Sequence, residues 1–322
     1  MRPVLIVGVD DAEVRAVSTE LERLGCPSRF LSTRAPLELD LAEDRARWRI
    51  GDPPLALELA RDAEPPFSAV FIRLLALTPT HPADSSHWTR DNFLRARFYD
   101  GEILALKLAL LQHLQACGVP MYNGVSVAEL ELKASRLITM MQAGLPVPPS
   151  LFTQDAAALR AFAERHGELI YKPVTGGAQV RRLAATDLEP PRIDRLARAP
   201  VAFQPVVAGP DVRVYVCDGE VLGAVRIHSD HDIDARGRET GYEVLEPSAS
   251  VAGACVRACA ALGLRFSAVD LREGAAGEFR LLECNNHPMF ANIDRALGGA
   301  VARGLALRLA GERGPTQLSA AP

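Results

Sequence analysis

Residues 267–290, SAVDLREGAAGEFRLLECNNHPMF, decide the fold of this chain. Two runs rich in apolar residues flank a glycine-containing turn, a pattern that predicts a β-hairpin. Residues two apart on a strand face the same side, so Glu283 and Asn285 project together, and strand pairing brings Asp270 beside them. Two carboxylates and an amide oxygen suit Mg²⁺ that also binds phosphate oxygens. Polar strand ends with a structural role would give the same pattern, so the hairpin alone leaves both interpretations open.

A lysine in an apolar strand lies upstream of this hairpin. Lys172 stands in ELIYKPV (168–174), which is followed by TGGAQ and by a second strand, QVRRLAA (179–185). A lysine in a half-buried strand needs an anionic partner, and glycines let backbone N–H groups approach phosphate oxygens. The alternative is a solvated lysine on an edge strand. Only three of the 36 basic residues are lysines, which favours a chemical role for each lysine that remains.

The other candidate side chains have ordinary interpretations as well. Lys107 and Lys133 lie in helical patterns and are each interpreted, by position alone, as a cation on a helix surface. Arg213 and Arg236 occur in DVR and DAR, where a planar guanidinium can hold phosphate or carboxylate with two hydrogen bonds. Trp48 and Trp88 are expected in scaffold packing, with a substrate cleft as the alternative. His228 and His231 do not share a strand face, so a metal site there is not favoured. Cys255 and Cys259 are expected on the core side of a helix.

The order of elements predicts an α/β fold that becomes α+β in its C-terminal part. The first third alternates strands and helices, except for a polar, proline-punctuated stretch at 35–66 without an assigned element and an irregular loop at 78–89. The expected strands are 4–9, 28–32, 68–74, 168–174, 179–185, 201–207, 211–217 and 220–227, and the expected helices are 11–24, 99–116, 126–144, 155–166, 251–262 and 294–309. We predict an N-terminal domain at 1–120, subdomains at 121–200 and 201–311, and a disordered tail at 312–322.

Composition excludes several classes of protein. The chain has 322 residues, 48% apolar and 24% charged, with a net charge of −4, which gives no support for a nucleic-acid or membrane-surface partner. No Walker A loop, GxGxxG, HExxH or GxSxG motif occurs. The start is too polar for a signal peptide, and no apolar run is long enough to span a membrane. Six scattered cysteines without a CxxC pair favour reduced thiols and a cytoplasmic location.

Five motifs in sequence order resemble the ATP-grasp carboxylate–amine ligases. They are ELKASRLITMMQAGLPVPPS, LIYKPVTGG, FQPVVAGPDVRVYVCDGEVLGAVRI, IDAR, and SAVDL with LLECNNHPMF, and they extend over residues from about 121 to 310. Within that superfamily the chain looks closest to the ligases that add glutamate to a ribosomal protein and to the graspetide (microviridin-type) peptide ligases. The resemblance implies an ATP-grasp fold, with residues 121–200 as its lid subdomain and a Rossmann-like pre-ATP-grasp domain at the N-terminus.

The resemblance also implies a role for each matching residue. Lys133 and Lys172 would contact the α- and β-phosphates of ATP, with the Gly176-Gly177 turn folded over them. The hinge strand FQPVV would bind adenine through Gln204, Pro205 and Val206, where the proline leaves the Val206 N–H to serve the ring nitrogen. Asp211 would lie near the ribose or the acceptor. The predicted catalytic residues are Arg213 and Arg236, at the γ-phosphate and carboxylate, and the predicted Mg²⁺ ligands are Asp270, Glu283 and Asn285.

The implied reaction joins a carboxylate to an amine, or to a hydroxyl, with ADP and phosphate as products. The expected cofactors are ATP and two Mg²⁺ ions, with Mn²⁺ as a substitute, and the expected partners are peptide or small-molecule substrates and a second copy in a homodimer. Arg238, where the glutamate-adding ligases tend to carry asparagine, departs from the family pattern. The alternatives are a ligase for free amino acids and a nucleotide-binding protein without catalysis.

Overall fold

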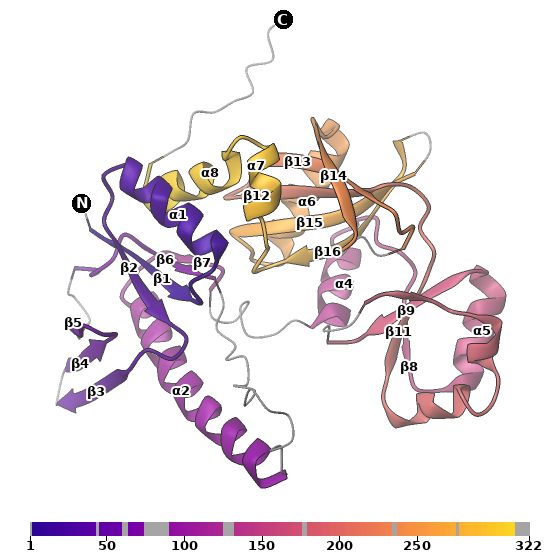
Figure 1. Cartoon of the computed structure of the whole chain (residues 1–322), viewed down its shortest axis with the longest axis horizontal. Helices are drawn as coiled ribbons and strands as arrows, with labels where there is room; N and C mark the ends of the chain where they lie inside the picture. The colour runs from indigo at the N-terminus through magenta and orange to yellow at the C-terminus, as the bar shows by residue number, and fades with distance from the viewer. Residues whose placement is uncertain are drawn as a thin grey trace, which may run out of the picture. The chain divides into compact units, whose positions relative to one another are not determined.

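A computed structural model of the chain describes residues 2–42, 45–59, 64–73, 90–124, 132–175, 179–233, 237–274 and 277–312. Gly176, Gly177, Arg236, Trp88 and the end of the tail lie outside these ranges, so the predictions for them stay predictions. Two compact units make up the chain (Figure 1). Unit 1 is Met1–Glu129, Met289–Ala291 and Ala302–Pro322, and unit 2 is Leu130–Pro288 and Asn292–Val301.

Unit 1 is built on a four-stranded parallel sheet in the order β2-β1-β6-β7. β1 is buried along its whole length, as expected for a strand covered on both faces. α1 begins where the Asp11 carboxylate accepts the N–H of Val14. The elements are β1 (Val4–Gly8), α1 (Ala12–Arg23), β2 (Ser28–Ser32), β6 (Ala69–Ile72), α2 (Arg90–Ala116), β7 (Met121–Tyr122) and α8 (Ala300–Leu309). The predicted α/β alternation of the first third is confirmed.

A second sheet of unit 1 fills much of the stretch that the sequence left without elements. It is antiparallel, in the order β3-β4-β5, with bounds Leu37–Ala42, Arg45–Ile50 and Leu55–Leu59. β4, RARWRI, alternates strictly between exposed and buried residues. The alternation of charged and apolar residues in RARWRI is a strand signal in the sequence. The charged residues of the exposed face and the flanking prolines make the stretch polar as a whole, which is why no strand was predicted there.

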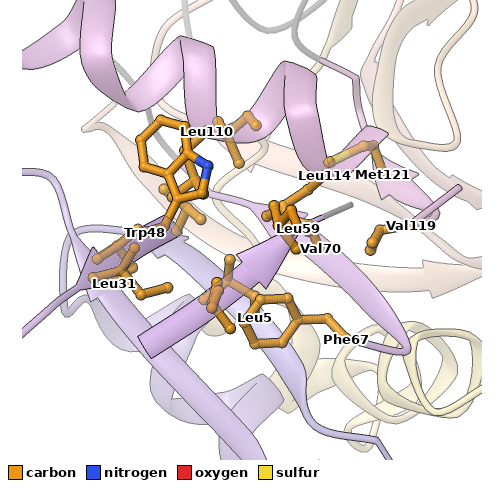
Figure 2. Close-up of a cluster of buried hydrophobic side chains, with 14 of the residues drawn as sticks. Leu5, Leu31, Trp48, Leu59, Phe67, Val70, Leu110, Leu114, Val119 and Met121 are labelled. Carbon is orange, nitrogen blue, oxygen red and sulfur yellow. The ribbon is translucent and has the colours of Figure 1, made fainter. Parts of the chain in front are cut away.

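The core of unit 1 lies between these sheets and α2. Trp48 is buried at its centre together with Leu110 and Leu114 of α2, and Leu5 and Val70 of the parallel sheet line it as well (Figure 2). The Trp48 indole N–H donates to Nδ1 of His113 at 3.2 Å, which satisfies its one polar atom. Of the two predicted roles for Trp48, the structure therefore shows scaffold packing.

Lys107 corrects the sequence interpretation. It is fully buried within α2 rather than on the helix surface, and its ammonium group donates to the Thr33 carbonyl. Burial, assisted by the nearby Arg34 cation, lowers the pKa of Lys107 to about 8. Leu110, Leu111 and Leu114 follow at three, four and seven residues, so the helical period already placed Lys107 on the core face.

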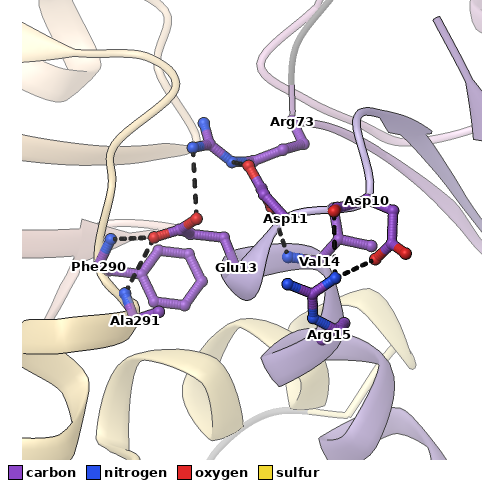
Figure 3. Close-up of polar contacts among 8 residues, drawn as sticks. All are labelled: Asp10, Asp11, Glu13, Val14, Arg15, Arg73, Phe290 and Ala291. Carbon is purple, nitrogen blue, oxygen red and sulfur yellow. Dashed lines mark hydrogen bonds and ion pairs between the residues drawn. The ribbon is translucent and has the colours of Figure 1, made fainter.

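A buried carboxylate near the start of α1 joins two parts of unit 1. Glu13 accepts the backbone N–H groups of Phe290 and Ala291, each at 3.1 Å, and its other oxygen lies 3.5 Å from the Arg73 guanidinium (Figure 3). Arg73 also donates to Asp11 at 2.9 Å. Burial acts to raise the pKa of Glu13, but the Ala291 N–H and the Arg73 charge outweigh it and lower that pKa.

We expect Glu13→Gln to lower the free energy of unfolding by about 1–2 kcal/mol at neutral pH, because the amide oxygen can still accept both backbone N–H groups but the charge that faces Arg73 is lost. The pKa of Glu13 is lowered by folding, so its contribution is present above the ordinary glutamate pKa of about 4.3 and is lost as the pH falls through the folded value. Urea unfolding between pH 7 and pH 3 measures this loss. Glu22→Gln, on the exposed side of α1, is the control. Equal effects of the two substitutions on the free energy of unfolding would mean that the buried contacts of Glu13 do not stabilise unit 1.

Unit 2 contains a four-stranded antiparallel sheet, called the lid sheet below, in the order β10-β9-β11-β8, and a five-stranded antiparallel sheet in the order β14-β13-β12-β15-β16. The lid sheet comprises β8 (Leu151–Thr153), β9 (Leu169–Pro173), β10 (Arg181–Arg182) and β11 (Val201–Pro205). The five-stranded sheet comprises β12 (Asp211–Cys217), β13 (Glu220–Ser229), β14 (Glu239–Leu245), β15 (Phe266–Glu273) and β16 (Phe279–Asn285). The helices are α4 (Lys133–Gln142), α5 (Ala156–His166), η2 (Ala185–Leu188), η3 (Ile193–Arg198), α6 (Ala249–Ala261) and α7 (Ala291–Ala296). The predicted mixed α+β architecture is confirmed.

The observed boundaries differ from the predicted ones in three places. β7 pairs with β6, so the chain stays in unit 1 beyond Met121. β11 pairs with β8 and β9 and belongs to the lid sheet rather than to the part that follows residue 200. The predicted helix 294–309 is interrupted by Gly298 and Gly299, whose φ angles of 62° and 80° lie in the left-handed region.

The exit from the lid sheet passes close to the five-stranded sheet at Gly209. This residue has a φ of 113°, and a Cβ there would lie 1.8 Å from the carbonyl oxygen of Glu273. Only glycine fits that approach. Across the described residues, no helix is long and apolar enough to cross a membrane.

Candidate active site

The hairpin predicted from SAVDLR and LLECNN forms as β15 and β16. Asp270 stands directly opposite Glu283, and Ala268 opposite Asn285. The register shifts between Asp270 and Leu271, a β-bulge of the type that often re-aims side chains next to functional sites. The Asn285 amide nitrogen donates to Oδ2 of Asp270 at 2.9 Å. The structure thus brings the three predicted metal ligands to one place on the five-stranded sheet.

Arg213 joins this group from the neighbouring strand β12. Its register partner on β15 is Asp270, and the guanidinium donates to both carboxylate oxygens at 2.7 and 3.0 Å. Burial acts to lower the pKa of Arg213, but the paired Asp270 carboxylate outweighs it and raises that pKa. Arg213 therefore stays charged beside Asp270 at every physiological pH.

The chemistry of these side chains fits Mg²⁺. Because Asn285 turns its amide nitrogen toward Asp270, its carbonyl oxygen remains as an acceptor for a cation. No group of three His, Cys, Asp or Glu side chains that could hold a metal was found in the described ranges. Two carboxylates and one amide oxygen do not fill the six coordination positions of Mg²⁺. Proteins usually bind Mg²⁺ through one or two carboxylates, and phosphate oxygens of the substrate and water fill the other positions.

A pocket beside Glu283 is lined by the two lysines that are predicted to bind phosphate. It is lined by Lys133, Arg136, Leu137, Met140, Lys172, Leu282, Glu283 and Cys284, from α4, β9 and β16. The Lys133 ammonium group lies 3.8 Å from the Glu283 carboxylate, and its side chain is only 13% exposed. Lys133 therefore faces this pocket, and its interpretation as a cation on the helix surface is wrong. Lys172 is buried at the pocket wall.

The predicted adenine hinge lies at the end of β11. Gln204 is buried, and its side-chain amide donates to the Ser150 hydroxyl at 2.8 Å. Pro205 pairs with Leu169 in the register of β9. The Val206 N–H donates to the Glu168 carbonyl at 2.9 Å, which extends the β9–β11 ladder by one residue. That N–H is therefore occupied in this structure, contrary to the expectation that it serves the adenine ring.

Asp211 is held by Arg272, a residue without a role in the sequence-based predictions. The Arg272 guanidinium donates to both oxygens of Asp211 at 2.6 and 3.1 Å. It also donates to the carbonyls of Val207 at 2.9 Å and Asp232 at 2.8 Å. Arg272 is almost completely buried, so this one cation ties the residues after the hinge to the segment that leads to Arg236. The sequence does contain one signal for Arg272: it follows Asp270 by two residues and therefore lies on the same face of the strand.

The remaining candidates are not brought into this site. His228 lies 3.3 Å from the Glu243 carboxylate on the exposed part of β13, and it forms no metal cluster with His231 among the residues the structure describes. Cys255 and Cys259 are buried in α6, as predicted.

Comparison with solved structures finds similarity along almost the whole chain. The ATP-grasp ligase PsnB, complexed with a phosphomimetic variant of a minimal precursor, Mg and ADP, is 35% identical, with a TM-score of 0.82, and the match covers 96% of this chain and 98% of that one. Macrocyclase MdnC bound with precursor peptide MdnA, from Microcystis aeruginosa, is 18% identical with a TM-score of 0.76 over 96% of this chain and all of that one, which indicates the same fold.

Comparison with curated sequences gives a partial match to a different ligase. D-alanine–D-alanine ligase from Ectopseudomonas mendocina is 30% identical over 215 residues, which are 60% of this chain and 67% of that protein. No family model matches the sequence.

Proposed function

Since the chain belongs to the ATP-grasp ligases, a family of enzymes, we propose that it joins a carboxylate to an amine or a hydroxyl within a peptide substrate. In this proposal ATP and Mg²⁺ are the cofactors, an acyl phosphate is the intermediate, and ADP and phosphate are released. The observation that supports it most is the match to PsnB, which extends over both chains almost end to end and is found with a precursor, Mg and ADP.

We assign ATP binding to the pocket between α4, β9 and β16. Lys133 and Lys172 approach it from two elements, and charge-assisted contacts from ammonium groups stabilise phosphate oxygens. Gly176 and Gly177 follow β9 directly and would close over the same phosphates. Gln204 and the Pro205 carbonyl would face the adenine, and the ring nitrogen requires a donor other than the occupied Val206 N–H.

Asp270, Glu283 and Asn285 would hold Mg²⁺, which supplies neutralisation of the negative charge on the transferred phosphate. Arg213 orients Asp270 through two hydrogen bonds. In its place beside the carboxylate hairpin, the guanidinium also supplies positive charge where the attacking carboxylate meets the γ-phosphate. Arg236 is proposed for the same function from the segment after Asp232.

The reaction would proceed in two steps. The substrate carboxylate oxygen attacks the γ-phosphorus, the bond to the β-phosphate oxygen breaks, and ADP leaves. The amine or hydroxyl then attacks the acyl carbon, phosphate leaves, and the attacking group gives up a proton. Both steps build negative charge on oxygen, so fixed cations in a site closed to water provide the largest catalytic contribution. Arg272 would orient Asp211 at the acceptor side through its paired hydrogen bonds.

A ligase for free amino acids is the second candidate. It is favoured by the match to a D-alanine–D-alanine ligase, although that match covers 60% of this chain. A nucleotide-binding protein without catalysis is the weaker alternative, because Asp270, Glu283 and Asn285 lie together and such side chains suit Mg²⁺ that also binds phosphate oxygens. A homodimer and a cytoplasmic location, the latter supported by six free cysteines, complete the proposal.

The decisive experiment supplies ATP, Mg²⁺ and a peptide encoded beside this gene that repeats acidic residues together with Thr or Lys. We expect ADP and phosphate, and a peptide that has lost one water for each bond formed, as measured by mass spectrometry. D-Alanine and other free amino acids form the parallel arm. AMP and pyrophosphate as products would contradict the acyl-phosphate mechanism, and a dipeptide product with an unmodified peptide would favour the second candidate.

A further inference from the structure

The strand that carries two of the proposed metal ligands lies at the edge of its sheet. β16 pairs with β15 on one side only, and its other side has no strand partner among the described residues. Backbone groups on such an edge are satisfied by water or by other parts of the chain. Here α4 and the loop after it contact two backbone groups of β16. The Leu281 N–H donates to the Pro146 carbonyl at 2.8 Å, and the Arg136 guanidinium donates to the Cys284 carbonyl at 3.0 Å.

One face of α4 contacts β16. The side chains of this face follow the i, i+3, i+4, i+7 spacing and line the pocket to which we assign ATP: Lys133, Arg136, Leu137 and Met140. The Lys133 ammonium group lies 3.8 Å from the Glu283 carboxylate, and Met140 Sδ lies 3.8 Å from Cys284 Sγ. Together with the Arg136 hydrogen bond, these contacts fall on consecutive residues of β16. They therefore hold the strand at one position along the helix.

The place of Arg136 in α4 is unfavourable for the helix itself. The start of a helix favours acidic side chains, because the helix dipole is positive there, and the first turn of α4 has none. Lys133 and Arg136 put positive charge at this end instead. Contacts outside the helix compensate for that cost, and those of both cations are made with β16. A planar guanidinium gives such a contact a fixed direction, which the flexible ammonium group of lysine does not.

We propose that Arg136 is a positioning residue, which holds Glu283 and Asn285 in place beside the phosphates that Lys133 binds. The hydrogen bond from Arg136 falls on the carbonyl of Cys284, the residue between the two ligands, so a shift of β16 along α4 would move both of them. Arg136 donates to the protein and not to the nucleotide, which separates its role from that of Lys133. The kinetic part of this inference rests on the proposed ligase function, whereas its effect on β16 does not.

Arg136→Met tests this role, because it keeps the aliphatic stem and removes the donor and the charge. We expect kcat for ADP formation to fall at least about tenfold and the ATP dissociation constant to rise no more than about threefold, since misplaced ligands affect the transition state more than the bound nucleotide. Arg136→Lys can still donate to the Cys284 carbonyl and should restore kcat to within about threefold of the unsubstituted chain. Arg160→Met is the matched control, because Arg160 also donates to a backbone carbonyl, that of Leu188, but does not line the pocket. It should leave kcat unchanged.

Hydrogen exchange of the full chain, measured without ATP or peptide, tests the effect on β16 directly. Arg136→Met should speed amide exchange in β16 at least about fivefold, and Arg136→Lys and Arg160→Met should not, because an edge strand with fewer contacts opens more often. Unchanged exchange in β12 and β13 establishes that each variant is folded.

Three results would overturn the proposal. They are unchanged exchange of β16 in Arg136→Met, a kcat of this variant within about threefold of the unsubstituted chain, and an unchanged kcat with a loss of ATP affinity as large as that of Lys172→Met, which would make Arg136 a direct phosphate ligand. If the unsubstituted chain forms no ADP with any substrate, the proposed ligase function fails, and the exchange of β16 alone then decides whether Arg136 positions the strand.

Discussion

Replacing Glu283 by glutamine is expected to lower kcat at least about 100-fold while ATP binding weakens only modestly. The substitution keeps the size and the hydrogen-bonding atoms of the side chain but removes one negative charge opposite Asp270. ATP would still be held by Lys133, Lys172 and the hinge, so its dissociation constant should change little. Charge that develops in the transition state would lose its compensation, and such losses lower kcat more than binding.

The measurements are ATP titration by calorimetry and ADP formation with the peptide substrate. Glu278→Gln is the matched control, because Glu278 lies exposed just before β16 on the same hairpin. Near-native ADP formation by Glu283→Gln would mean that Glu283 is not a metal ligand. A large loss of ATP affinity with unchanged kcat would instead assign Glu283 to ground-state binding, through its contact with Lys133.

Replacing Lys172 by alanine is expected to weaken ATP binding about 10- to 150-fold. A charge-assisted contact to a phosphate contributes about 1.5–3 kcal/mol, which converts to that range of dissociation constants. Lys172 is buried on β9 and its side chain lines the pocket, so the loss should appear for ATP and ADP alike. Lys172→Met keeps the packing of the aliphatic stem and should show a similar loss, which separates charge from packing.

The choice of control follows from the structure. Lys107 is not suitable, because the buried ammonium group supports the fold of unit 1 and its removal would affect stability. Arg198→Ala removes an exposed cation from η3, away from the pocket residues, and should leave ATP affinity unchanged. Equal losses for Lys172→Ala and Arg198→Ala would mean that Lys172 acts only through the overall charge.

The parts of the site that follow from strand periodicity could be predicted from the sequence. The placement of Asp270, Glu283 and Asn285 requires only that side chains alternate and that a hairpin pairs its two strands. Lys172 stood out because a cation in an apolar strand is costly unless it meets an anion. These arguments use neighbours in sequence or across one turn. The structure agrees with the placement of the hairpin residues and with the burial of Lys172, and the roles of these residues stay predictions.

The parts that depend on distant pairing could not be predicted. The contacts of Arg272 join three segments of the chain, and no local pattern specifies which strand lies beside β15. The occupied Val206 N–H depends likewise on the register between β9 and β11. Lys107 differs, because its helical spacing from Leu110, Leu111 and Leu114 is enough to predict that it lies on the buried face of α2.

The passage from the lid sheet to β12 restricts how the two sheets can turn relative to each other. Val206 is bound to Glu168 on the lid side, and Gly209 lies against the Glu273 carbonyl on the other side. Val207 and Ala208 lie between these two contacts. Since the Val207 carbonyl accepts a hydrogen bond from Arg272, any rotation there strains or breaks that bond. A change in the angle between the two sheets would therefore act on the same guanidinium that holds Asp211.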